Sequence, residues 1–108
     1  MDASETIKLI KITYEKNEYG VAQKKEIVNP VYAQVKDATQ SEFFQAGANG
    51  IKAEKKFTMF FYDYDNETII EYNGERYSVY RTHRPRKDII ELYVTKDKGV
   101  QNGRNDST

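Results

Sequence analysis

The fold is decided by residues 68–81, which read TIIEYNGERYSVYR. Asn73-Gly74 divides this stretch into two runs in which apolar and polar residues alternate. An Asn-Gly pair in this setting is the strongest short-range signal for a β-hairpin, because both central residues of the turn need a positive φ. Such a turn also fixes the register of its two strands. We therefore predict three cross-strand pairs, which are Tyr72–Glu75, Glu71–Arg76 and Ile70–Tyr77.

Most of the remaining chain also has the pattern of short β-strands. The apolar residues of Thr6–Tyr14 change phase near Leu9-Ile10, and we expect a bulge or bend there, because a half-buried strand buries only one face. Pro30 lacks a backbone donor, so we expect it to begin or bend a strand. Further strands are expected at 21–29, 31–35, 57–62 and 90–94. Six to seven strands with short turns predict an all-β fold, a small antiparallel β-barrel or sandwich.

One short α-helix is predicted between the central strands. Thr39 and Glu42 have the spacing of a capping box at its start. Gly47 and Gly50 end the helix after about two turns, and a helix this short is marginal unless it docks on the sheet. The stretch that follows, Gly47–Lys56, contains small and then basic residues, and we expect it to be a mobile loop.

Aromatic residues are expected to join this helix to the sheet. Phe43 and Phe44 supply its apolar stripe, and Phe60 and Tyr62 are the aromatic residues expected to pack against them. Two adjacent residues on a short helix cannot both face inward, so one phenylalanine of the pair is a candidate interface anchor. The sequence therefore points to a helix that both packs on the sheet and offers a contact.

Length and composition indicate one domain without cysteine chemistry. We expect residues 6–96 to form a single β-barrel domain and residues 97–108 to form a disordered polar tail. The absence of cysteine excludes disulfides and thiolate metal sites. Seventeen basic and seventeen acidic residues argue against a dedicated duplex-DNA binder. No apolar run approaches the ~20 residues that a membrane-spanning helix needs.

The sequence gives little support to catalysis. His83 is the single histidine and is surrounded by arginines, so we interpret it as a solvated loop residue rather than a general base. Asp63, Asp65 and Glu67 are interpreted as a solvated acidic turn, because the glycine and distal glutamate of a calcium loop are missing. We therefore predict a non-enzymatic protein with no catalytic, cofactor-binding or metal-binding residues.

Two basic segments are the stronger candidates for binding. If both lie at one end of a barrel, they can contact phosphates without reading base sequence. The alternative is a solvated surface whose charge is offset by nearby acidic residues. The first basic segment contains Lys52, Lys55 and Lys56, and the second basic segment contains Arg81, Arg84, Arg86 and Lys87.

Four segments then occur in an order that is typical of one family. They are 31–35 (VYAQV), 41–47 (SEFFQAG), 70–79 (IEYNGERYSV) and 86–92 (RKDIIEL). In their order and spacing, the chain resembles the head–tail joining family of long-tailed bacteriophages, also called head-closure or head-completion proteins. The resemblance covers about residues 6–95. Many members carry a basic segment where this chain has Phe61-Tyr62-Asp63.

The resemblance implies a structural β-barrel protein that forms a ring below the portal and its adaptor. Such a protein joins the DNA-filled head to the tail and, in some relatives, helps to close the DNA channel. The expected partners are portal-adaptor and tail-terminator proteins, with a monomer in isolation, non-specific contact with passing DNA and no membrane. The expected location is the virion, at the head–tail interface, after synthesis in the host bacterial cytoplasm.

Candidate residues follow from this interpretation and from its rival. The candidates for partner contacts are Phe43, Phe44 and Ile51, and those facing the channel or DNA are Lys52, Lys55, Lys56, Arg84 and Arg86. The rival is an OB-like module that binds single-stranded nucleic acid. Its stacking residues would be Phe60, Tyr62 and Tyr80.

Overall fold

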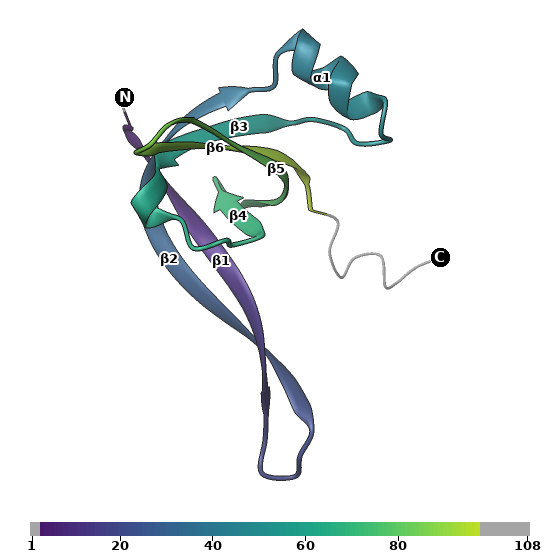
Figure 1. The fold of residues 1–108 in the computed structure, drawn as a ribbon. Helices are drawn as coiled ribbons and strands as arrows, with labels where there is room; N and C mark the ends of the chain where they lie inside the picture. Colours follow the sequence, from purple (N-terminus) through teal and green to yellow (C-terminus); the bar gives the residue numbers. More distant parts are fainter. Residues whose placement is uncertain (1–2, 98–108) are drawn as a thin grey trace.

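Six antiparallel strands close into a barrel in the computed structural model, which describes residues 3–97 (Figure 1). Around the barrel the order is β1-β2-β3-β6-β5-β4, and β4 pairs with β1 to close it. The all-β prediction, with one helix between central strands, is confirmed. The elements are β1 (Glu5–Lys16), β2 (Ala22–Asp37), α1 (Gln40–Gly47), β3 (Lys55–Phe60), the 3₁₀ turn η1 (Phe61–Asp63), β4 (Ile69–Tyr72), β5 (Glu75–Arg86) and β6 (Ile89–Lys96).

The Asn-Gly hairpin has the predicted register. Tyr72 pairs with Glu75, Glu71 with Arg76, and Ile70 with Tyr77. Asn73 and Gly74 have φ values of 51° and 78°, as the two-residue turn requires. This hairpin forms β4 and the first part of β5, so the local turn sequence places two of the six strands.

Alternate residues of the strands fill the inside of the barrel. Phe57 is at the centre of this core, and its ring makes edge-on contacts with Tyr72 and Tyr77 at centroid distances of 5.7 and 5.9 Å. The predicted inward residues of the last strand are confirmed, since Ile90, Leu92 and Val94 are buried. The other buried members of the core are Ile7, Leu9, Val31, Ala33, Met59, Ile70 and Tyr77.

The prediction of a bulge near Leu9-Ile10 is wrong. The pairing of β1 with β2 runs without a register shift, and β1 instead buries residues on both faces. Leu9 faces the core, whereas Ile10 lies on the outer face between Val28 and Ile69. Across that face a bidentate ion pair joins β5 to β2, with nitrogen–oxygen distances of 2.8 and 2.9 Å between Arg76 and Glu26. The apolar phase change therefore reflects the burial of Ile10 on the outer face, opposite Val28 and Ile69.

The far part of the β1–β2 hairpin projects away from the barrel (Figure 1). We call residues 11–28 the arm, because β1 pairs with β4 only over Lys8–Ile10 and β2 pairs with β3 only over Gln34–Asp37. β2 is one continuous strand, so the expectation that Pro30 would begin a strand is wrong. Pro30 is tolerated because that part of β2 has no β3 neighbour.

The end of the described chain is fastened to the barrel. The backbone N–H of Asp97 donates to the carbonyl oxygen of Arg76, and the Ser78 hydroxyl donates to the Asp97 carboxylate. Asp97 is the first residue of the tail that was predicted to be disordered, but these two hydrogen bonds hold it in place. The rest of that tail, residues 98–108, lies outside the described residues.

Candidate functional site

The helix α1 begins at the predicted capping box. The Thr39 hydroxyl accepts a hydrogen bond from the Glu42 N–H at 3.1 Å, and the Glu42 carboxylate accepts one from the Thr39 N–H at 2.9 Å. After the helix, the Ile51 N–H donates to the carbonyl oxygen of Ala46. These bonds satisfy backbone groups at both ends of a helix that is too short to be stable alone.

The expected aromatic packing between this helix and the sheet is wrong. Phe43 and Phe44 are exposed, the latter at 65%, and so are Phe60 and Tyr62. The helix turns a different face to the barrel, because residues at i, i+3, i+4 and i+7 share one side. The side that faces the barrel carries Glu42, Gln45, Ala46 and Asn49. In this orientation both phenylalanines face outward.

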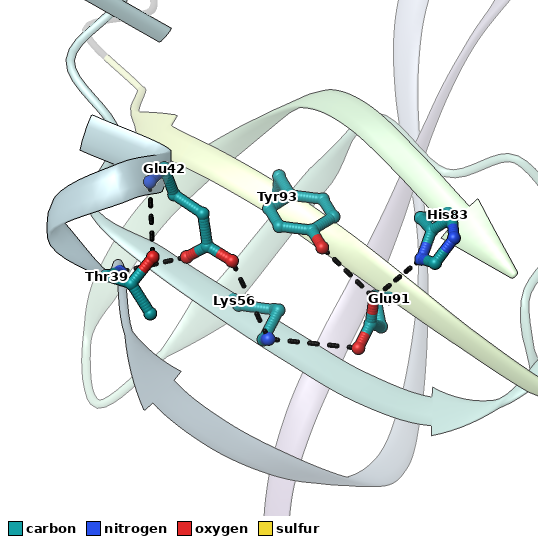
Figure 2. A network of polar contacts seen from close by, with 6 residues as sticks. All are labelled: Thr39, Glu42, Lys56, His83, Glu91 and Tyr93. Atoms are coloured by element: carbon teal, nitrogen blue, oxygen red, sulfur yellow. Dashed lines mark hydrogen bonds and ion pairs between the residues drawn. The ribbon is translucent and has the colours of Figure 1, made fainter. Parts of the chain in front are cut away.

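A polar network holds α1 against the outer face of β3 and β6 (Figure 2). The Lys56 ammonium on β3 lies 3.6 Å from the Glu42 carboxylate and 3.8 Å from that of Glu91 on β6. The Tyr93 hydroxyl donates to Glu91 at 3.0 Å, and His83 Nδ1 lies 2.9 Å from the same carboxylate oxygen. His83 belongs to β5, so its prediction as a loop residue is wrong.

The network shifts the acid–base behaviour of two of its members. Burial favours the neutral form of Glu91, but hydrogen bonds from His83 and Tyr93 and the charge of Lys56 outweigh it and hold the pKa of Glu91 below its ordinary value. Burial and the hydrogen bond to Glu91 raise the pKa of Tyr93 to about 12. Tyr93 is therefore protonated, and Glu91 ionised, at neutral pH.

Replacing Glu91 by glutamine tests whether the ionised carboxylate stabilises the fold. Its folded-state pKa is depressed, so this stabilisation is present above the ordinary glutamate pKa of 4.5 and is lost as the pH falls through the lower folded-state value. We expect Glu91→Gln to lower the free energy of unfolding by about 1–2 kcal/mol at pH 7. Urea unfolding should show a smaller loss at about pH 3. An equal loss at both pH values would contradict the link to ionisation.

A cavity of about 340 Å³ lies between α1 and the barrel, and we call it the α1 cavity. The register shift between Val79 and Arg81 leaves Tyr80 as the extra residue of β5 and sets Arg81 beside Tyr93. The Arg81 guanidinium lies over the Tyr93 ring, 4.7 Å from its centroid. Cavity and network share Glu42 and Tyr93. The remaining lining residues are Gln45, Ala46, Asn49, Ile51, Tyr80 and Arg81.

Of the predicted interface residues, the structure brings Ile51 to the α1 cavity and places Phe43 and Phe44 on the opposite side of the helix. The cavity itself was not predictable from the sequence, because it depends on the bulge at Tyr80. The one sequence signal for this cavity was a polar helix face, with Glu42, Gln45 and Asn49 at helical spacing.

Apart from Arg81, which lies opposite Tyr93 as Lys56 does, the two basic segments do not lie at one end of the barrel. Lys55 and Lys56 are in β3 rather than in a loop, opposite Val94 and Tyr93 of β6, whereas Arg86 is opposite Ile89 at the other end of β6. A separation of four to five strand residues corresponds to roughly 15 Å. The condition for a joint phosphate-binding surface is therefore not met.

Most of the predicted cationic residues are engaged in ion pairs. Lys55 pairs with Asp37 at 2.7 Å, Lys56 belongs to the network, and Lys52 lies 3.9 Å from Glu54. At the opposite end, Arg86 lies 3.6 Å from Asp88. The Arg84 guanidinium stacks on Phe61 at 3.5 Å and donates to the Lys87 carbonyl oxygen. The end of β5 and the first residue of the turn after it, residues 84–87, thus form the basic group that remains most available to a phosphate.

The acidic turn is more ordered than predicted. Glu67 is buried, and its carboxylate accepts a hydrogen bond from the Asp65 N–H at 2.7 Å. The Tyr64 hydroxyl donates to the carbonyl oxygen of Glu67. The prediction that Glu67 is solvated is therefore wrong. Within residues 3–97, no group of three or more histidine, aspartate and glutamate side chains is arranged to hold a metal ion.

No model of a known protein family matches this chain, and no curated protein matches it. Within the described part of the chain, none of the helices has the length and apolar character to span a membrane.

Proposed function

We propose that this chain is a structural, non-enzymatic head-closure subunit of a long-tailed bacteriophage. In this proposal it assembles as a ring below the portal and its adaptor, joins the head to the tail and helps to close the DNA channel. The resemblance of segments 31–35, 41–47, 70–79 and 86–92 to the head–tail joining family supports it. Its site of action is then the head–tail interface of the virion, after synthesis in the host bacterial cytoplasm.

The observation that carries the proposal is the arm. A two-stranded ribbon in water is marginally stable on its own, because it lacks a third strand or a helix to cover it. This ribbon nevertheless exposes large apolar residues, among them Tyr14, Tyr19 and Val21. Clustered exposed apolar groups are typical of surfaces that bind other proteins. A compact barrel with such an extension suits a subunit that is completed by its neighbours.

The proposed partners are the adaptor above the ring and the tail-terminator protein below it. Phe43 and Phe44 stand out from α1, which is held in place by the network, so they are available as rigid aromatic anchors. The channel-facing group in this proposal is the end of β5, with Arg84 and Arg86. The formal net charge of zero favours weak, sliding contact with DNA over tight binding.

The rival OB-like function has weaker support. An OB-fold is a five-stranded, partly open barrel, whereas this barrel has six strands and is closed. Phe60 lies opposite Ile89, while Tyr80 lies near Tyr93 at the other end of β6, roughly 13 Å away. The proposed stacking residues therefore do not share one platform.

Electron microscopy tests the proposal directly. The purified chain is mixed with DNA-filled heads that carry portal and adaptor, and with tails, all from the phage whose genome encodes it. We expect a ring of this chain at the vertex and head–tail joining that depends on it. Equal joining without the chain would overturn the proposal. Micromolar and steeply salt-dependent binding of single-stranded oligonucleotides by the monomer, measured by fluorescence anisotropy, would favour the OB-like alternative.

A further inference from the structure

The tip of the arm is built as a rigid, outward-facing contact. The Asn17 side-chain oxygen accepts hydrogen bonds from the N–H groups of Tyr19 and Val21 at 2.9 and 3.0 Å. The Gly20 N–H donates to the Asn17 carbonyl oxygen, and Gly20 has a φ of 79°. The tip therefore presents Tyr19, which is 81% exposed, from a preformed turn. Preorganisation of this kind lowers the entropy cost of binding.

The α1 cavity has the complementary chemistry. Its wall contains the aromatic rings of Tyr80 and Tyr93 and the half-buried Ile51. Its volume of about 340 Å³ is near the lower end of the range for binding pockets, about 300–1,000 Å³, which suits a single large side chain. Arg81 lines the cavity and, within residues 3–97, forms no ion pair.

Charge complementarity favours the arm tip as the occupant. Glu18 is the one charged residue between Lys16 and Ala22, it is exposed, and within the described residues it forms no ion pair. Glu18 directly precedes Tyr19, so the tip of the arm exposes a carboxylate next to an aromatic ring. The α1 cavity offers an aromatic wall and the Arg81 guanidinium, which match that pair. The carboxylate in its lining, Glu42, already accepts a hydrogen bond from the Thr39 N–H and lies 3.6 Å from Lys56, so its charge is offset.

The tip and the cavity of one molecule cannot meet. The arm ends at one extreme of the molecule, and α1 lies at the opposite end (Figure 1). The β1–β2 pairing keeps the arm extended without a register shift. Any contact between these two surfaces therefore joins different molecules, and two unlike surfaces make a heterologous contact that repeats from copy to copy.

We infer that the arm tip of one copy inserts Tyr19 into the α1 cavity of the next, with Glu18 paired to Arg81. This inference deepens the proposed ring and rests on it for ring closure, because a heterologous contact closes into a ring only when its rotation permits. The tip is small compared with the roughly 1,200 Å² that stable interfaces bury, so the dilute chain is a monomer and the contact forms on assembly.

Cross-linking of the purified chain tests the contact without any phage component. The chain has no cysteine, so one can be introduced as Val21→Cys in one preparation and Gln45→Cys in another. A short bismaleimide should join the two variants into a heterodimer when they are mixed at high concentration. A mixture of Val21→Cys with Tyr62→Cys, which is exposed outside the cavity, is the matched control and should give about tenfold less product.

Three substitutions identify the contacting side chains. Adding Tyr19→Ala to the Val21→Cys variant should reduce cross-linking about tenfold, since Tyr19 is the anchor. Arg81→Glu in the Gln45→Cys variant should reduce it several-fold, and Glu18→Arg in the partner should restore it. Equal yields with Gln45→Cys and Tyr62→Cys, or no effect of Tyr19→Ala, would overturn the inference. In a second mixture that also contains the adaptor and tail proteins, capture of Gln45→Cys by one of them in place of the arm would also overturn it, while leaving the head–tail function standing.

Discussion

Phe57→Ala is expected to destabilise the barrel by about 3–5 kcal/mol, the usual range for truncating a fully buried phenylalanine. Phe57 has no exposed surface and contacts the rings of Tyr72 and Tyr77. β3 pairs with β2 and β6 at this position, opposite Val35 and Leu92. The surrounding strands are held by these ladders, so they cannot collapse into the space that the ring leaves. Urea unfolding monitored by circular dichroism measures the loss.

Tyr62→Ala is the matched control for this prediction. Tyr62 is a large aromatic residue of the same segment, but it is 77% exposed and belongs to η1. Its truncation should change the free energy of unfolding by less than about 0.5 kcal/mol. A loss for Phe57→Ala of under about 1 kcal/mol would mean that the core is not centred on β3.

Local patterns predicted the parts of the fold that local interactions determine. The Asn73-Gly74 turn fixed three cross-strand pairs, because a two-residue turn leaves one register. The Thr39 and Glu42 capping box was likewise predictable from spacing, since its hydrogen bonds span three residues. Ile90, Leu92 and Val94 were likewise predicted to face inward, because the alternation of apolar and polar residues is also a local pattern.

Features that depend on distant strands were not predictable in this way. Ile10 is buried on the outer face opposite Val28 and Ile69, and the Arg76–Glu26 pair joins residues 50 positions apart in sequence. The orientation of α1 was predicted from the apolar character of Phe43 and Phe44, yet tertiary contacts of Glu42 with Lys56 decided it. The α1 cavity required the bulge at Tyr80, and alternation alone does not reveal a bulge. The strand at 21–29 was predicted, but not its projection from the barrel as part of the arm.

Phe44→Gln is expected to impair assembly while leaving the barrel intact. The side chain is 65% exposed, and glutamine is a good helix former, so the free energy of unfolding should change by less than about 0.5 kcal/mol. If Phe44 anchors the ring to its neighbour, its loss should cost at least about 2 kcal/mol of binding, or roughly 30-fold in affinity. The measurement is the concentration of the chain that gives half-maximal head–tail joining, scored by electron microscopy.

Tyr62→Gln separates a specific anchor from a general loss of apolar surface. It removes a comparably exposed aromatic residue from η1, which follows β3 on the side away from α1. We expect it to leave the half-maximal concentration within about threefold of the unmodified chain, since most exposed residues contribute little to binding. Because the network of Lys56 with Glu42 and Glu91 holds α1 in place, Phe44 is presented rigidly and its removal is not compensated by movement of the helix. Equal effects of the two glutamine variants would therefore contradict the role of Phe44 as a specific anchor.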